Sequence, residues 1–532
     1  MKKLPVGLQD FRYLRENDFA YVDKTSFLFR IIDSGKFYFL SRPRRFGKSL
    51  TVSTLKYLFQ GEKSLFQDTW IYDRWDWNTR YPVVHISLTE VDTDGPDQVK
   101  RGLLFQIQRT ADSFGVSLKQ DHYKYAFSEL LEKLARRERV IILIDEYDKP
   151  ILDHLHEPAL ADAIRGVLRN FYSTIKDADP FLRFVFITGI TKFTKAGVFS
   201  TLNNLNDITF KEPYATMLGY TQEELEEVFS EHIDAASHKL DQDRQVFLDD
   251  LRRYYNGFSF DGQEFVYNPF SVLGFFGDYR YRNYWFESGS PYFLSQYIRT
   301  HRIEFDKLTD HPVTESLFSN YEIEKSPPES FLVQSGYLTF KDYDRELGYT
   351  LGFPNQEVKD AFNQLILLNS YEIDNYQAGA IRAAMIEGLR NRDFPRIFAQ
   401  MQQVFSAIPY HLYLNRLEKK ELTGGIERLE RYYHVVLLTL LWGCGIEAVV
   451  EEPSNPGRSD LAIRYGQDVW ILELKKAPNP QALKATAQQG LEQIKEKGYA
   501  NRYKGRTLFL VGIGIDEEKR NLGCYAMERV SS

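Results

Sequence analysis

Residues 41–49 read Ser41-Arg-Pro-Arg-Arg-Phe-Gly-Lys-Ser49, and this stretch decides how the first part of the chain folds. It follows a short apolar run at 37–40 and precedes a helix-like run at 48–59. A turn that leads from a strand into a helix presents backbone N–H groups that bind phosphate. Gly47 lets the backbone approach, Lys48 reaches the β- and γ-phosphates, and Ser49 ligates a magnesium ion. The stretch therefore predicts a nucleotide-binding site.

The same stretch departs from the GxxxxGK[ST] consensus, because Arg42 stands where the first glycine is expected. Two readings of Arg42, Arg44 and Arg45 stay open. Their side chains brace the phosphates directly, or they face a neighbouring subunit or a nucleic acid.

A second element, Ile141-Ile-Leu-Ile-Asp-Glu146, is an apolar strand that ends in two acids. Asp145 is expected to hold magnesium through water, and Glu146 to polarise the attacking water; a buried strand with a solvated acidic end is the alternative. In the following strand, Thr188 either senses the γ-phosphate or is a hydrogen-bonded strand end. Together with the phosphate-binding stretch, the acidic strand favours nucleotide binding.

Strand-like and helical runs alternate over the first two hundred residues, which predicts an α/β fold with a parallel sheet covered on both faces. The clearest strands are expected at 82–87, 139–144 and 182–188. The region that follows is helical and loop-rich, and the C-terminal region reads as a compact α/β unit. We expect four parts: 1–215 (nucleotide-binding), 216–370 (helical, lid-like), 371–420 (helical connector) and 421–532 (α/β).

A hairpin in the last part places three ionisable residues on one face. The turn Tyr465-Gly-Gln-Asp468 pairs 465 with 468, and this register puts Asp460 directly across from Glu473. Lys475 lies two residues beyond Glu473 and points the same way. Two opposed carboxylates repel each other unless a cation such as Mg²⁺ or Mn²⁺ lies between them. Lys475 can orient or deprotonate a water that attacks a phosphodiester, so the hairpin predicts a nuclease site.

The composition limits the class of protein. Of the 532 residues, 43% are hydrophobic and 27% charged, as in soluble globular proteins. The two cysteines, Cys444 and Cys524, exclude a disulfide scaffold and fit a reducing compartment. No apolar run is long enough for a signal peptide or a membrane span, so we expect a cytoplasmic protein with no membrane partner.

The net charge of −7 hides two basic regions. Residues 1–60 hold 12 Lys and Arg against 5 Asp and Glu, and residues 471–510 hold 8 against 3. These regions permit contacts with phosphates or a nucleic-acid backbone, although a solvated surface is the ordinary reading.

Taken together, the sequence resembles a family of bacterial AAA-ATPase-like proteins that carry a C-terminal PD-(D/E)XK nuclease domain. The resemblance covers nearly the whole chain and rests on these segments: 4–8, 21–25, 42–50, 143–148, 188–191, 199–205, 255–258, 354–358 and 427–515.

The resemblance implies a P-loop ATPase fold that uses ATP and magnesium, in which an arginine at the position of Arg42 is usual. In the C-terminal part it implies that Glu430, or else Glu427, adds a metal-binding acid from the first helix. It also places Gln493 beside the active site, with Tyr499 nearby.

The expected function is an ATP-dependent or ATP-gated deoxyribonuclease in defence or mobile-element control, with DNA as partner and RNA not excluded. The protein could form a homo-oligomer, in which Arg165 and Arg169 act as arginine fingers on a neighbouring subunit. The alternative is that these two arginines form a solvated helix face. One alternative is an ATP-switched nucleic-acid-binding or signalling module whose nuclease-like domain does not cut. Another is a nucleotide-controlled scaffold that binds a protein.

Overall fold

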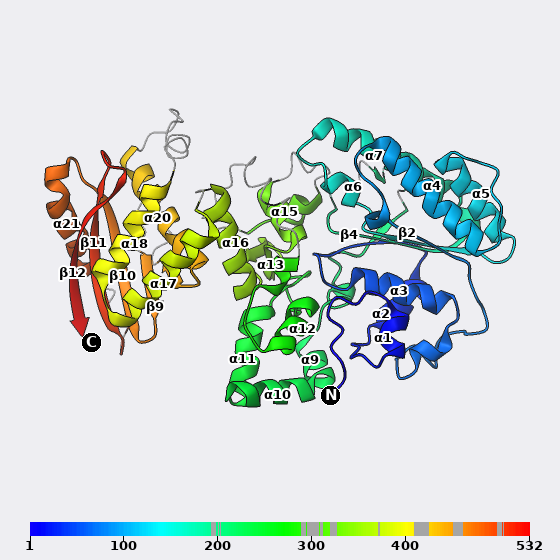
Figure 1. Cartoon of the computed structure of the whole chain (residues 1–532), viewed down its shortest axis with the longest axis horizontal. Helices are drawn as coiled ribbons and strands as arrows, with labels where there is room; N and C mark the ends of the chain where they lie inside the picture. Colours follow the sequence, from blue (N-terminus) through cyan, green and yellow to red (C-terminus); the bar gives the residue numbers. More distant parts are fainter. Residues whose placement is uncertain are drawn as a thin grey trace. The chain divides into compact units, whose positions relative to one another are not determined.

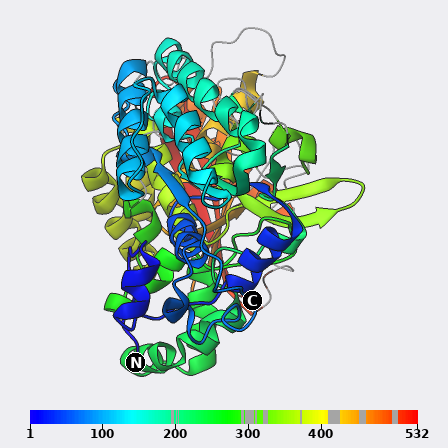
Figure 2. The same ribbon diagram turned by 90° about the vertical axis from the view of Figure 1, so that its right-hand side faces the viewer.

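The structure is a computed structural model of the chain, shown in Figures 1 and 2. It describes residues 1–192, 198, 199, 202, 204–288, 294, 308, 312–319, 327–370, 373–408, 425–450, 461–496, 503 and 505–531. The chain forms two compact units, residues 1–293 with 307–358, and residues 294–306 with 359–532. Most of the middle region therefore lies in the first unit, while the boundaries of the four expected parts remain a prediction.

The first unit contains a five-stranded sheet in the order β2-β3-β4-β1-β5, in which every neighbouring pair is parallel. Its strands are β1 (Phe37–Ser41), β2 (Val83–Ser87), β3 (Val140–Asp145), β4 (Leu182–Gly189) and β5 (Asn206–Asp207). The side chains of β3 are buried along its whole length, as expected for a central strand covered on both faces. The prediction of a parallel sheet is confirmed.

Helices cover both faces of this sheet. Figure 1 shows α3 on one face and α4, α5 and α7 on the other. The helices of this part are α1 (Phe11–Glu16), α2 (Thr25–Ser34), α3 (Lys48–Phe59), α4 (Pro96–Ser113), α5 (Tyr123–Ala135), α6 (Lys149–Leu152) and α7 (Pro158–Asp177). Because all four described pairs of strands run parallel, their carboxyl ends meet at one edge, where ligands bind in open α/β sheets.

The remainder of the first unit is mostly helical and ends in a β-hairpin. Its helices are α9 (Gln222–Val228), α10 (Ser230–Leu240), α11 (Arg244–Tyr255), α12 (Pro269–Asp278), α13 (Tyr284–Ser288) and α15 (Pro328–Ser335). The hairpin consists of β6 (Thr339–Asp344) and β7 (Gly348–Gly352), and Figure 2 shows it standing apart from the helices.

The second unit is built on a mixed sheet in the order β12-β11-β10-β9-β8. Its strands are β8 (Glu447–Val450), β9 (Leu461–Tyr465), β10 (Asp468–Lys476), β11 (Thr507–Asp516) and β12 (Asn521–Ser531). Its helices are α17 (Asn375–Asn391), α18 (Phe394–Ala407), α20 (Gly425–Gly443) and α21 (Leu483–Glu496), and α16 (Gln356–Ser370) belongs to it from Lys359 onward. Strand β12 was not predicted.

Both faces of this sheet are buried. The side chains of Leu461, Ile463, Leu472 and Leu474, which we expected to face the core, are all buried. On the opposite face, Val469 and Ile471 pack with Leu491 and Ile494 of α21. The stretch expected as a connector contributes directly to the unit, because Arg392, which ends α17, forms a two-pronged ion pair with Asp468.

Helix α21 approaches the sheet unusually closely, through Gly490 and Gly512. A Cβ on Gly512 would lie 2.0 Å from the carbonyl oxygen of Ala487. Backbone rather than side chain blocks that space, so only glycine fits there. The contact sets how far α21 stands from β10 and β11.

We predict that Gly512→Ala lowers the free energy of unfolding by about 1–3 kcal/mol, because α21 must move away from the sheet. Gly379→Ala in α17 is the control, since a Cβ there meets nothing within 4 Å. It should raise stability by about 0.5–1 kcal/mol, through helix propensity alone. Denaturant unfolding of both variants measures the difference, and equal stabilities would contradict the close approach.

Candidate nucleotide and nuclease sites

A cavity of about 520 Å³ opens at the carboxyl end of the first sheet, around the loop between β1 and α3. One part of its wall is polar and contains the phosphate-binding stretch. The polar wall consists of Arg44, Arg45, Gly47, Lys48, Ser49, Thr51, Glu146, Lys149 and Asp153. The rest of the lining is largely apolar, so the cavity offers different surroundings to the two ends of a nucleotide.

The loop takes a tight conformation that depends on Gly47. Gly47 has φ of 92°, in the left-handed region, and it begins α3. The Lys48 ammonium turns back and donates to the carbonyl oxygens of Arg42 and Pro43, at 2.9 Å each. Burial lowers the pKa of Lys48, while the charges of Glu146 and Asp145 act in the opposite direction. The side chain that we expected to bind phosphate is thus buried at the cavity wall.

The acidic carboxyl end of β3 lies near this loop, at the same end of the sheet. Asp145 is 5% exposed and accepts a hydrogen bond of 2.5 Å from the Thr188 hydroxyl. Thr188 is itself fully buried. In this structure Thr188 orients Asp145, which favours the reading of Thr188 as a hydrogen-bonded strand end. Glu146 has φ of 53° and lines the cavity, as a group that acts on water must.

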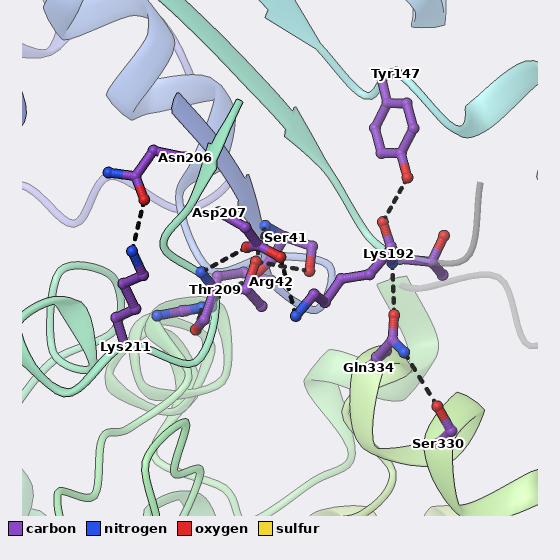
Figure 3. Close-up of polar contacts among 11 residues, drawn as sticks. Ser41, Arg42, Tyr147, Lys192, Asn206, Asp207, Thr209, Lys211, Ser330 and Gln334 are labelled. Atoms are coloured by element: carbon purple, nitrogen blue, oxygen red, sulfur yellow. Dashed lines mark hydrogen bonds and ion pairs between the residues drawn. The ribbon is translucent and has the colours of Figure 1, made fainter. Parts of the chain in front are cut away.

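Arg42 lies away from the cavity, and this corrects the expectation that its side chain braces the phosphates. Its guanidinium is 1% exposed and donates to the carbonyl oxygens of Ser41, Thr209 and Tyr214. It also stacks on Phe260 at 3.8 Å, and burial lowers its pKa to about 9. Figure 3 shows this arginine between the ends of β1 and β5. Arg42 therefore holds the loop in place from the side that faces away from the cavity.

Arg44 and Arg45 do line the cavity. The Arg45 guanidinium lies 4.8 Å from the ring of Phe270. Among the described residues, the Arg44 guanidinium has no hydrogen-bond or ion-pair partner, and its charge lowers the pKa of nearby Lys48. Two arginines that line one cavity favour a bound anion.

The apolar part of the cavity comes from segments far apart in the sequence. Its walls are Pro5, Leu8, Leu14, Ala20, Val22, Leu28, Met217, Leu218, Pro269, Phe270 and Leu273. Lys24 joins two of these segments, because its ammonium donates to Glu224 at 2.6 Å and to the carbonyl oxygen of Thr216 at 2.7 Å. Sequence reasoning missed this compartment, although the stretches at 4–8 and 21–25 were conspicuous.

The end of β4 is connected to helix α15 of the same unit (Figure 3). The Lys192 backbone N–H donates to Gln334 at 2.6 Å, and the Lys192 ammonium lies 3.0 Å from Asp207. Just before it, Thr191 donates from its N–H and its hydroxyl to Asp148. Asp148 is fully buried, and burial raises its pKa to about 6.

The hairpin of the second unit has the expected register. The described pairs run from Asp468 opposite Tyr465 to Leu472 opposite Leu461. The next pair in this register joins Glu473 with Asp460, and Asp460 lies outside the described residues, as does Tyr499. The register itself is confirmed as far as the structure describes it.

Around Glu473, several predicted residues come together. Glu473 is buried, and its carboxylate accepts a hydrogen bond of 2.9 Å from Gln493 and lies 4.0 Å from the Lys475 ammonium. Glu430 accepts a hydrogen bond of 2.9 Å from the backbone N–H of Lys476. The side chain of Glu427, the competitor of Glu430, lies outside the described residues.

The described residues offer more ligands for a divalent metal in the first unit than at the hairpin of the second unit. In the first unit, Ser49 and the buried Asp145 offer oxygen ligands of the kind that magnesium prefers. Among the described side chains, no three acidic, histidine or cysteine residues form a metal-binding group. A metal at the hairpin would therefore need Glu473 together with a residue such as Asp460.

The architecture is that of a P-loop-like α/β unit joined in one chain to a nuclease-like α/β unit. Residues 5–199 match the family model described as a predicted AAA-ATPase, and residues 428–524 match that of the PD-(D/E)XK nuclease superfamily. No helix in the described parts of the chain is long and apolar enough to cross a lipid bilayer.

A curated relative extends the similarity to the whole chain. It is a protein of Azotobacter chroococcum mcd 1, described as an uncharacterized protein in the vnfD 5′ region, and it is 36% identical over 537 residues, covering 99% of each chain. The chain belongs to the family of AAA-ATPase-like proteins with a C-terminal PD-(D/E)XK nuclease superfamily domain.

The positions of the loop arginines generate a prediction about their separate roles. Arg42→Met removes one donor from each of the carbonyl oxygens of Ser41, Thr209 and Tyr214, the last of which still accepts from the Met217 N–H, and should lower the free energy of unfolding by about 2–4 kcal/mol. Arg44→Met should leave stability within about 0.5 kcal/mol and weaken ATP binding about tenfold, since only Arg44 faces the cavity. Denaturant unfolding and nucleotide titration check both variants. Wild-type stability combined with lost ATP affinity in Arg42→Met would contradict the assignment.

Proposed function

We propose that the first unit binds and hydrolyses ATP with magnesium. The observation that carries this proposal is the cavity in which Arg44, Lys48, Ser49 and Glu146 share one wall. The positive charges of Arg44 and Lys48 suit a triphosphate, and the apolar residues that line the same cavity suit a nucleoside. Magnesium, held by Ser49 and through water by Asp145, would neutralise charge on the phosphates.

Each residue then has a separate task in hydrolysis. The Lys48 ammonium exchanges its two carbonyl acceptors for β- and γ-phosphate oxygens. Glu146 accepts a hydrogen bond from the water that attacks the γ-phosphorus and takes up its proton. Thr188 holds the Asp145 carboxylate through the hydrogen bond of 2.5 Å, so that Asp145 need not reorganise.

For the second unit we propose metal-dependent cleavage of a phosphodiester, with DNA as the substrate. Glu473 and Asp460 would bind Mg²⁺ or Mn²⁺, with Glu430 as a further acid near the metal. Lys475, 4.0 Å from Glu473, orients or deprotonates the attacking water. Gln493 holds the carboxylate of Glu473 in place, and the close approach of α21 brings Gln493 within reach.

We further propose that the two units together form an ATP-gated deoxyribonuclease that acts in defence or mobile-element control; the presence of both domains in one chain supports the coupling. A nuclease that cuts only under ATP control is tolerable to the cell that makes it. The alternative is an ATP-switched binding module, in which the hairpin binds nucleic acid without cutting it. The cleavage experiment below distinguishes this module from a nuclease.

We predict that Lys48→Ala lowers ATP affinity about 100-fold, which corresponds to about 2.7 kcal/mol. Glu146→Gln should still bind ATP and should hydrolyse it about 10²–10⁴-fold more slowly, because only water activation is lost. Lys56→Ala, on the same helix but outside the cavity, is the control and should behave as the wild type. Nucleotide titration and phosphate release measure the effects, and unchanged ATP turnover in Lys48→Ala would rule out the ATP site.

The nuclease prediction concerns metal binding without nucleotide. Mn²⁺ or Mg²⁺ should raise the melting temperature of the wild type in the absence of ATP, and should support cleavage of plasmid DNA. Glu473→Ala and Asp460→Asn should lose both effects, whereas Lys475→Ala should keep the stabilisation and lose cleavage. Glu528→Ala, an exposed acid paired with Lys495, is the control.

Each result assigns one function. A metal-induced shift and cleavage that both persist in Asp460→Asn would exclude the hairpin as the metal site. DNA binding by the wild type without any cleavage would replace the nuclease with the ATP-switched binding module.

A further inference from the structure

Lys149 is a cation of the nucleotide cavity that has no place in the proposed machinery so far. It lines the same cavity as Lys48, Ser49 and Glu146. Its backbone N–H donates to the carbonyl oxygen of Glu146 at 3.1 Å, so the two residues close one tight turn after β3. That turn brings Lys149 close to the group proposed to hold the attacking water.

The backbone beneath Lys149 is held firmly. Asp148, the preceding residue, is fully buried and accepts hydrogen bonds from the N–H groups of Ile190 and Thr191 and from the Thr191 hydroxyl. Ile151, two residues after Lys149, is fully buried in the core around the first sheet. A long, flexible side chain therefore projects from a fixed point at the cavity wall.

The side chain itself is held only weakly. Its ammonium is paired with Asp153, the residue that directly follows α6, and the two side chains are 32% and 33% exposed. Because about a third of each side chain is open to solvent, the pair is partly screened and contributes little to stability. In addition, the lysine precedes the acid along the helix, which is the less favourable order for a helical pair. A triphosphate carries more negative charge than the single carboxylate of Asp153.

The other cations that line the cavity have different contacts or assigned roles from Lys149. Lys24 is bound to Glu224, and Arg45 lies over Phe270. Lys48 is assigned to the β- and γ-phosphates, and Arg44 faces the cavity from the loop itself. Lys149 alone among these cations comes from the turn after β3 that carries Glu146, the group proposed to act on the attacking water.

We propose that Lys149 is a catalytic residue that leaves Asp153 when ATP binds and donates a hydrogen bond to a γ-phosphate oxygen. This inference rests on the proposed ATPase function. A water oxygen forms a bond to the γ-phosphorus while the bond from that phosphorus to the β–γ bridging oxygen breaks. ADP leaves with the bridging oxygen, the proton of the water passes to Glu146, and Lys149 remains protonated throughout. Lys149 thus supplies from the same chain the positive charge that an arginine finger supplies from a partner.

The test compares Lys149→Met, Lys149→Arg and Asp153→Asn in the full chain, with ATP as substrate. Lys149→Met should bind ATP within about threefold of the wild type and lose kcat about 100-fold, and Lys149→Arg should restore part of kcat. Asp153→Asn releases the lysine and should raise kcat/KM about twofold. A merely structural ion pair predicts the opposite, because Asp153→Asn would then lower activity as much as Lys149→Met.

Lys133→Met is the matched control, because Lys133 and Glu129 form another ion pair one turn apart, 2.7 Å long, on α5 and outside the cavity. It should leave both kcat and KM unchanged. Wild-type kcat in Lys149→Met, or an equal loss in Asp153→Asn, would overturn the inference while leaving the ATPase proposal intact. A wild-type protein without ATP turnover would overturn the ATPase proposal first, and this inference with it.

Discussion

The buried guanidinium of Arg42 is the interaction on which the phosphate loop depends. A charged group away from water is costly unless it is well hydrogen-bonded. Arg42 meets that condition by donating to carbonyl oxygens of three segments, at Ser41, Thr209 and Tyr214, and by stacking on Phe260. One side chain therefore fixes the end of β1, the chain after β5 and the helical region against one another.

The neighbouring residues of the loop extend this arrangement. Phe46 packs edge-on against Phe258, and the indole N–H of Trp285 donates to the carbonyl oxygen of Arg44 at 3.0 Å. The backbone N–H of Trp285 donates in turn to the buried carboxylate of Glu357 at 2.8 Å. The loop thus has one side toward the cavity and another side in the helical region. This explains why bulky residues occupy a stretch in which a glycine is the usual choice.

In the second unit, a glycine contact has a comparable role. Because Gly512 admits the backbone of α21 so closely, Gln493 reaches Glu473 and a buried carboxylate obtains a donor. The described register of β9 and β10 ends with Leu472 opposite Leu461, directly before Glu473. The position of α21 thus sets the surroundings of the Glu473 carboxylate.

The parallel sheet, the phosphate loop, the acidic strand end and the register of the hairpin could all be predicted from the amino-acid sequence. These features are local, because they follow from short apolar runs, glycine positions and the alternation of side chains along a strand. Sequence could not decide the direction of the Arg42 side chain, since the carbonyls that hold it come from residues about 170 positions away. The apolar compartment escaped notice for the same reason, because its walls come from both ends of the first unit. That Arg42 supports the loop while Arg44 and Lys149 line the cavity is visible only in the folded chain, since burial and long-range contacts, rather than local pattern, set the direction of a flexible side chain.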